Sequence, residues 1–93
     1  MIKIKVSTFG NFKAYFGENA VLEMPETADL KKMLTDMADR YSDGRDLLFD
    51  KDGNIRRHLM IQVNKKRIAP SKAEEIILKD GDEIIIYPPV SGG

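Results

Sequence analysis

A single long amphipathic segment is the feature that most limits how this chain can fold. Across residues 28–42, apolar side chains recur at the spacing of one helical face, and charged residues lie opposite. The apolar positions are Leu30, Met33, Leu34, Met37, Ala38 and Tyr41. Thr27 is the expected N-cap, Asp29 falls in the first turn, and Gly44 is the expected stop. A domain with one such helix needs a sheet for the apolar face to cover.

Strand patterns flank this helix on both sides. They cover residues 1–9, 20–25, 59–64, 65–69 and 82–88. The unbroken run Ile84-Ile85-Ile86 is typical of a central strand that is covered on both faces. The order strand, strand, helix, strand, strand, strand predicts an α+β fold of the β-grasp type. We expect a mixed sheet with its first and last strands adjacent and parallel, and one main helix packed across it.

The loops carry two patterns with more than one interpretation. Residues 10–19 read as a turn or long hairpin loop whose aromatic residues, Phe12, Tyr15 and Phe16, either cover the open end of the core or form a stacking platform. The short basic clusters at residues 56–58 and 65–67 are either solvated faces or contacts for a protein partner, with RNA a weaker alternative. The acidic turn at residues 50–54 does not match a calcium loop, because its glycine comes too early.

Composition excludes several function classes. The chain has 93 residues, which is enough for one core, and its 15 basic and 15 acidic side chains cancel. It has no cysteine and one histidine, His58, so thiolate catalysis and a metal site are not expected. We find no convincing catalytic set, and expect no nucleic-acid or membrane partner. At the N-terminus, isoleucine and lysine alternate, and the long apolar core of a signal peptide is missing. The predicted location is therefore cytoplasmic.

The last six residues, "PPVSGG", have a composition suited to reaching into another protein. We divide the chain into a domain at residues 1–87 and a flexible tail at residues 88–93. The tail consists of Pro88, Pro89, Val90, Ser91, Gly92 and Gly93. The two prolines favour an extended backbone, and six residues reach about 20 Å at about 3.3 Å each. Because glycine has no Cβ, Gly92 and Gly93 would let the strip pass through a narrow channel. Such a strip can carry its terminal carboxylate into a partner's active site.

The segment "DGDEIIIYPPVSGG" resembles the C-terminal region of the molybdopterin synthase small subunit (MoaD) family. That family is grouped with the sulfur carrier ThiS and the archaeal small modifiers among ubiquitin-like β-grasp proteins. Val63-Asn64 matches the end of the family's third strand, and "FDKDGNIRRHLMIQVN" resembles a longer, archaeal-type branch. The loops depart from the family: Asn64 is followed by Lys65 where the branch often has Asn-Gly, and Lys13-Ala14 stands where many relatives have Arg-Glu.

The resemblance implies a carrier, not a self-sufficient enzyme. It implies that a ubiquitin-activating-like enzyme uses ATP to adenylate the Gly93 carboxylate, and that a sulfur donor converts the adenylate to a thiocarboxylate. The sulfur would pass to a precursor in the molybdopterin synthase large subunit, or to an equivalent acceptor. The chain itself would bind no permanent cofactor. The alternatives are a protein modifier joined to lysines, or a carrier for cysteine, thiamine or tRNA thiolation.

Tyr87, at the base of the tail, has two interpretations. It either docks on the partner protein or caps the edge of the core. The sequence alone leaves the two equally open.

Overall fold

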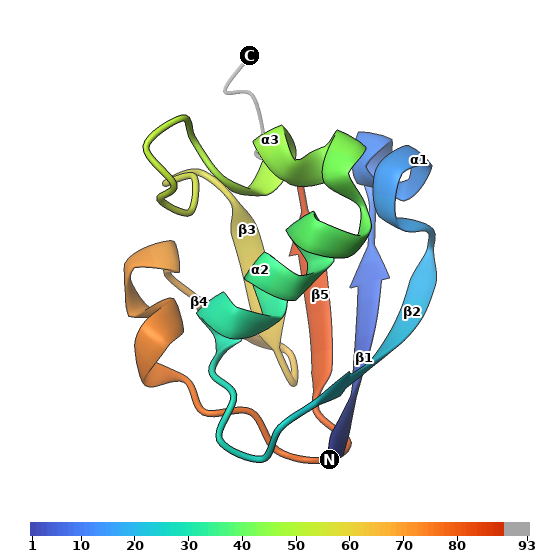
Figure 1. Cartoon of the computed structure of the whole chain (residues 1–93), viewed down its shortest axis with the longest axis vertical. Coiled ribbons are helices and arrows are strands. Elements are labelled where there is room, and N and C mark those ends of the chain that lie inside the picture. The colour runs from blue at the N-terminus through green and yellow to red at the C-terminus, as the bar shows by residue number, and fades with distance from the viewer. Residues whose placement is uncertain (89–93) are drawn as a thin grey trace.

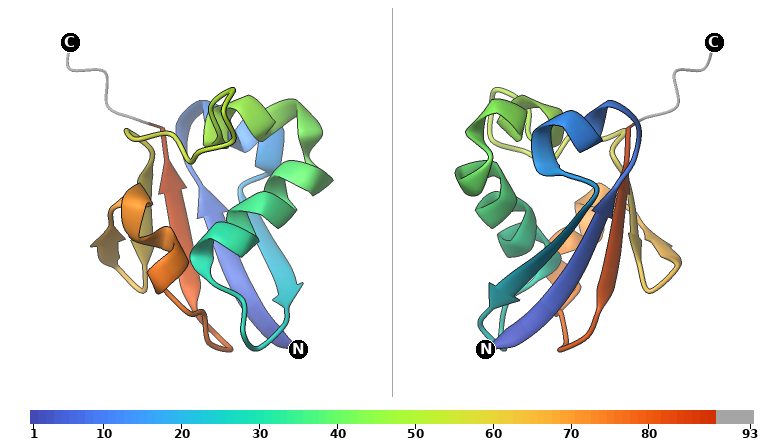
Figure 2. Two further views of the ribbon diagram at one scale, coloured as in Figure 1. Left: turned by 60° about the vertical axis from the view of Figure 1, so that its left-hand side comes forward. Right: turned by 90° about the vertical axis from the view of Figure 1, so that its right-hand side faces the viewer.

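The computed structural model describes residues 1–88 and shows one mixed sheet with helices on one side (Figures 1 and 2). The strands are β1 (Ile2–Thr8), β2 (Asn19–Met24), β3 (Met60–Val63), β4 (Lys66–Ile68) and β5 (Glu83–Tyr87). The main helix is α2 (Leu30–Arg40), and α1 (Lys13–Phe16) and α3 (Arg45–Leu48) are single turns. Three 3-10 segments complete the described part: η1 (Gly10–Phe12), η2 (Ser42–Gly44) and η3 (Pro70–Glu75).

The sheet has the order β2-β1-β5-β3-β4. β1 pairs with β2 in an antiparallel hairpin and with β5 in parallel, while β3 is antiparallel to both β5 and β4. The chain therefore crosses from the edge strand β2, through α2, to the other half of the sheet, and returns to its centre at β5. This is the β-grasp topology that the order of the sequence patterns predicts, including the parallel pairing of the first and last strands.

The core lies between α2 and one face of the sheet. Strand residues at alternate positions point toward the helix, so Ile4 and Val6 are buried, and Ile84 and Ile86 lie beside them on β5. The helix contributes the predicted apolar stripe: Leu30, Met33, Leu34, Met37 and Ala38 are all buried. Tyr41 packs against this cluster while partly exposed.

The limits of the main helix differ from the prediction at both ends. Asp29, not Thr27, is the N-cap, and its side chain accepts a hydrogen bond from the backbone N–H of Lys32. The helix ends at Arg40, and Gly44 is buried three residues beyond Tyr41. A Cβ on Gly44 would come within 2.5 Å of the Phe16 ring, so close packing explains this glycine better than helix termination does.

The last strand is covered on one face only, contrary to the expectation from its isoleucine run. Ile84 and Ile86 are buried under α2, while Ile85 points to the opposite face and is half-buried. In the described part of the chain, α2, α3 and the 3-10 segments lie on one side of the sheet (Figure 2). The other side, which we call the open face, is free to meet solvent or a partner.

Replacing Leu34 with alanine is expected to lower the free energy of unfolding by about 2–5 kcal/mol. Leu34 is 0% exposed at the centre of the helix stripe, so its truncation leaves a cavity that α2 and the sheet cannot close. Denaturant unfolding followed by circular dichroism measures the loss. Lys32→Ala, on the exposed side of the same helix, is the matched control and should change stability by about 0.5 kcal/mol or less. Equal losses in the two variants would contradict the assigned core.

Candidate functional site at the end of the last strand

The central strand β5 ends where the predicted tail begins, so the base of the tail lies at one end of the strands in the middle of the sheet. Its last residue, Tyr87, pairs with Met60 at the start of β3. On the other side, the backbone N–H of Phe9, just after β1, donates to the carbonyl of Ile86 at 3.2 Å. β5 is therefore held on both sides up to its end. Pro88 follows and is half-buried. It has no N–H to continue the pairing, so the ladder ends here.

Tyr87 lies on the open face and stacks on an exposed aromatic ring. The rings of Phe9 and Tyr87 are nearly parallel, with centroids 5.0 Å apart and an angle of 14° between their planes. Lys13 Nζ, from α1, lies 5.7 Å from the Phe9 centroid. Because the neighbouring Ile86 points into the core, Tyr87 points away from it and does not cap the core. Partner docking by Tyr87 remains a prediction.

Four side chains form an apolar patch on the open face beside the tail. The strand register places Phe9, Met60, Ile85 and Tyr87 next to one another across β1, β5 and β3. Phe9 is 41% exposed and the other three are partly exposed. We call these four residues the open-face patch. Gln62 and Arg67 lie beside it in register, which gives the patch a polar border. An apolar centre with a polar rim is the composition of a protein-binding surface.

Phe9 is a site residue that sequence reasoning missed. The prediction gave aromatic roles to Phe12, Tyr15 and Phe16, but Phe12 and Phe16 are 1% and 3% exposed and pack edge-on at 6.2 Å. They cover the end of the core, and the stacking-platform interpretation is wrong for both. The alternation of residues along β1 could have predicted that Phe9 lies on the exposed face. Positions 3, 5 and 7 are polar, and the next residue on the same face is an aromatic.

The other predicted site residues lie outside the described part of the chain. These are Pro89, Val90, Ser91, Gly92 and Gly93, and their role remains a prediction. Pro88, the first residue of the predicted tail, is the last one described. Pro88 lies at the border of the open-face patch, so the predicted tail would begin there.

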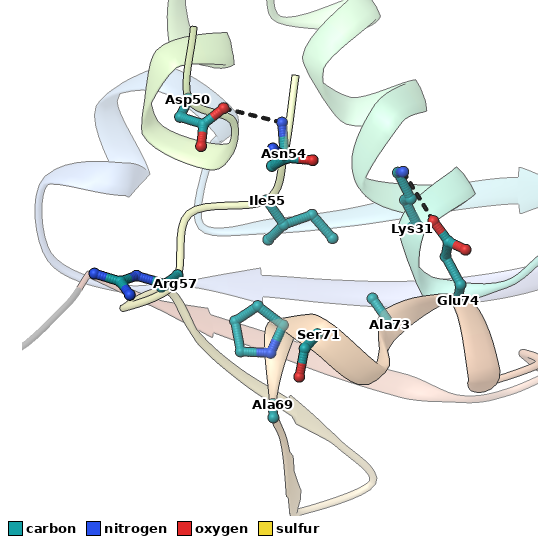
Figure 3. A pocket seen from close by; sticks show the side chains of 10 residues that line it. Lys31, Asp50, Asn54, Ile55, Arg57, Ala69, Ser71, Ala73 and Glu74 are labelled. Atoms are coloured by element: carbon teal, nitrogen blue, oxygen red, sulfur yellow. Dashed lines mark hydrogen bonds and ion pairs between the residues drawn. The ribbon is translucent and has the colours of Figure 1, made fainter. Parts of the chain in front are cut away.

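A pocket elsewhere on the molecule uses most of its charged side chains to hold the structure around it. It has a volume of about 620 Å³ and lies between α2, η3 and the loop at residues 50–57 (Figure 3). Three of its four charged lining side chains have partners: Lys31 Nζ donates to Glu74 Oε1 at 2.9 Å, a hydrogen bond that raises the pKa of Lys31. Asp50 Oδ1 accepts the backbone N–H groups of Asp52 and Asn54, which closes the acidic turn.

Residues 1–88 contain no group of three or more potential metal-ligating side chains. None of the helices described there is long and apolar enough to cross a membrane.

Comparison with known proteins identifies the family. The model of the ThiS family matches residues 6–93, nearly the whole chain. The chain belongs to the ThiS family. Its relatives are small ubiquitin-like sulfur carriers and modifiers with the β-grasp fold, as the resemblance of the terminal motif predicts. The match extends through the Gly-Gly pair and includes every predicted site residue.

Two archaeal modifiers are similar over their whole length. Small archaeal modifier protein 3 of Haloferax volcanii is 23% identical over 99% of this chain and 100% of its own. The solution structure of small archaeal modifier protein 1 from Methanosarcina acetivorans is 30% identical, with a TM-score of 0.80, and covers 100% of this chain and 98% of that one. These likenesses support the archaeal-type branch that the sequence resembles.

A third relative was solved together with a partner. It belongs to the complex of subunits 1 and 2 of the molybdopterin-converting factor from Helicobacter pylori. That chain is 25% identical, with a TM-score of 0.64, and the match covers 99% of this chain and 100% of that one. Proteins of this fold and family therefore bind partner proteins.

Proposed function

We propose that this ThiS-family protein is a sulfur carrier whose Gly93 carboxylate becomes a thiocarboxylate, for the synthesis of molybdopterin. The observation that carries the proposal is the family match, which includes the Gly-Gly pair at residues 92 and 93. The structure supports it with a strand that leads directly to the tail and an apolar patch beside the point where the tail begins. The similarity to a chain from the complex of subunits 1 and 2 of a molybdopterin-converting factor supports this choice of pathway.

The chemistry requires a partner at each step. A carboxylate is a poor electrophile, so the partner enzyme lets an oxygen of Gly93 attack the α-phosphate of ATP. Pyrophosphate leaves and an acyl-adenylate forms. Hydrosulfide then attacks the acyl carbon of the adenylate. The bond between this carbon and the phosphate oxygen of AMP breaks, AMP leaves, and a thiocarboxylate remains. Where the donor is a persulfide, a thiol afterwards reduces the S–S bond of the acyl intermediate. The groups that stabilise these charges belong to the partners.

The open-face patch is the surface that we assign to docking of those partners. Phe9 and Tyr87 present large, partly exposed rings that are already stacked on each other, so their ordering costs little on binding. Because Tyr87 directly precedes Pro88, a partner that binds the patch also receives the tail. Docking and delivery thus use surfaces that lie next to each other, at the end of β5.

Intact-mass spectrometry tests the proposal. The protein is incubated with ATP, a sulfide source and an adenylating enzyme encoded next to its gene or, failing that, one from a ThiS-family system. We expect a product heavier by the difference between sulfur and oxygen, localised to Gly93 and alkylated by iodoacetamide. Omission of ATP is the control and should leave the mass unchanged. If a cognate enzyme forms neither an adenylate nor this product, the proposal is wrong.

A protein modifier is the second candidate, and the two archaeal relatives favour it. It uses the same adenylate, but the acyl group passes to the amine of a target lysine instead of to sulfur. The product is an isopeptide bond with loss of AMP. Branched peptides with Gly93 joined to lysine, found in digests of cells that produce the protein, would show this function. The two functions share the adenylation step and can occur in one protein.

A further inference from the structure

Gly10 lies in direct contact with the first residue of the tail. Its φ angle is +62°, a backbone conformation that residues with a Cβ adopt at a cost. A Cβ built on Gly10 would lie 2.7 Å from Cγ and 3.3 Å from Cδ of Pro88. The first distance is shorter than any van der Waals contact between carbon atoms. The ring of Pro88 therefore occupies the space that a side chain at position 10 would fill.

The turn that contains Gly10 has little freedom to move away. Just before it, the N–H of Phe9 donates to the Ile86 carbonyl at 3.2 Å. Just after it, the N–H of Phe12 donates to the Phe9 carbonyl at 3.3 Å, and the Phe12 ring is 1% exposed in the core. The hydroxyl of Thr8, itself buried, donates to the carbonyl of Gly17 across the same turn. Gly10 is thus fixed on both sides by bonds and packing.

Pro88 has fewer backbone bonds to hold it than the turn at Gly10 has. β5 is fixed as far as Tyr87, which pairs with Met60, whereas Pro88 lies beyond the ladder. A Cβ at position 10 would therefore displace Pro88 and not the turn. The ring of proline locks its φ angle, so the ring cannot turn without its own backbone. Displacing the ring of Pro88 therefore also turns the backbone that follows it.

We propose that Gly10 is a positioning residue that sets the direction in which the tail leaves the domain. The contact between Gly10 and Pro88 fixes the start of the tail relative to the open-face patch, and so relative to any partner docked there. The consequence for sulfur transfer rests on the proposed function, but the direction of the tail does not. The two are therefore tested separately.

Paramagnetic relaxation enhancement tests the direction without any partner. The chain has no cysteine, so Ser91→Cys provides a single site for a nitroxide label. The label broadens the NMR signals of nearby amides. We expect Gly10→Ala to change the set of amide signals from residues 1–88 that are broadened. Gly81→Ala is the matched control, because Gly81 also has a positive φ, +87°, but a Cβ added there would meet nothing within 4 Å. If Gly10→Ala leaves the same broadening pattern as Gly81→Ala, the proposal is overturned.

A pair of variants tests whether the effect acts through the proline ring. With the adenylating enzyme, Gly10→Ala should lower kcat/KM for thiocarboxylate formation by about ten- to a hundredfold, since small displacements of a reacting group have effects of this size. In a Pro88→Ala background only the Cβ of residue 88 remains, 3.9 Å away, and the loss should shrink to about twofold. Equal losses in both backgrounds overturn the proposal. A changed relaxation pattern without any sulfur product supports the positioning role and contradicts the proposed function instead.

Discussion

A variant that lacks Gly93, and a variant with one alanine added after it, are both expected to form no thiocarboxylate. A change of one residue moves the terminal carboxylate by about 3 Å. Reacting atoms must approach to about 3–3.5 Å in the right orientation, and this geometry accounts for many powers of ten in rate. The measurement is intact-mass spectrometry with the adenylating enzyme, ATP and sulfide. Thermal unfolding should be unchanged, because neither variant touches the core formed by residues 1–88.

One alanine added before Met1 is the matched control for the extended variant. It adds the same mass at the start of the chain, beside β1, and leaves Gly93 untouched. We expect this control to form the product at the native rate. If the extended C-terminus supports sulfur transfer as well as the native one, Gly93 is not the reactive group, and a role as an interaction module without terminal chemistry becomes the better explanation.

The fold could be predicted because its determinants are local and periodic. The alternation in β1 and the helical stripe from Leu30 to Ala38 each give the buried face of their own element. One helix and five strands leave few ways to bury those faces together. The ends of the helix could not be predicted, because Thr27 and Asp29 are both good N-caps. The backbone of residues 28–30 bonds with the segment at 76–78, and this long-range contact selects Asp29.

The base of the tail could be predicted only in part. The motif around Pro88 and the terminal glycines is continuous in sequence, so its resemblance to the family was visible. The neighbours of Pro88 come from the other end of the chain. Phe9 and Gly10 meet Tyr87 and Pro88 only because β1 and β5 pair in parallel, with Thr8 opposite Ile86. That register depends on the whole sheet, and no local pattern specifies it.

Tyr87→Ala is expected to weaken binding to the adenylating enzyme by about 30- to 700-fold, the equivalent of about 2–4 kcal/mol for an aromatic hot spot. Tyr87 lies next to the tail, and its ring stacks on Phe9, so truncation removes the centre of the open-face patch and loosens its neighbour. Because the two rings act as a unit, Phe9→Ala added to Tyr87→Ala should weaken binding by less than the product of the single effects. Isothermal titration calorimetry measures each affinity.

The control for this prediction is Ile77→Ala. Ile77 is 54% exposed, so it is also a large apolar side chain at the surface, but it pairs with Asp29 at the start of α2 and not with the open-face patch. If exposed apolar area alone governed binding, Ile77→Ala would cost at least as much as the truncation of the less exposed Tyr87. If the patch is the docking surface, affinity should be unchanged in Ile77→Ala and lost in Tyr87→Ala, with both proteins folded by circular dichroism. Full affinity in Tyr87→Ala would assign docking to another surface and leave the stacked pair with a structural role alone.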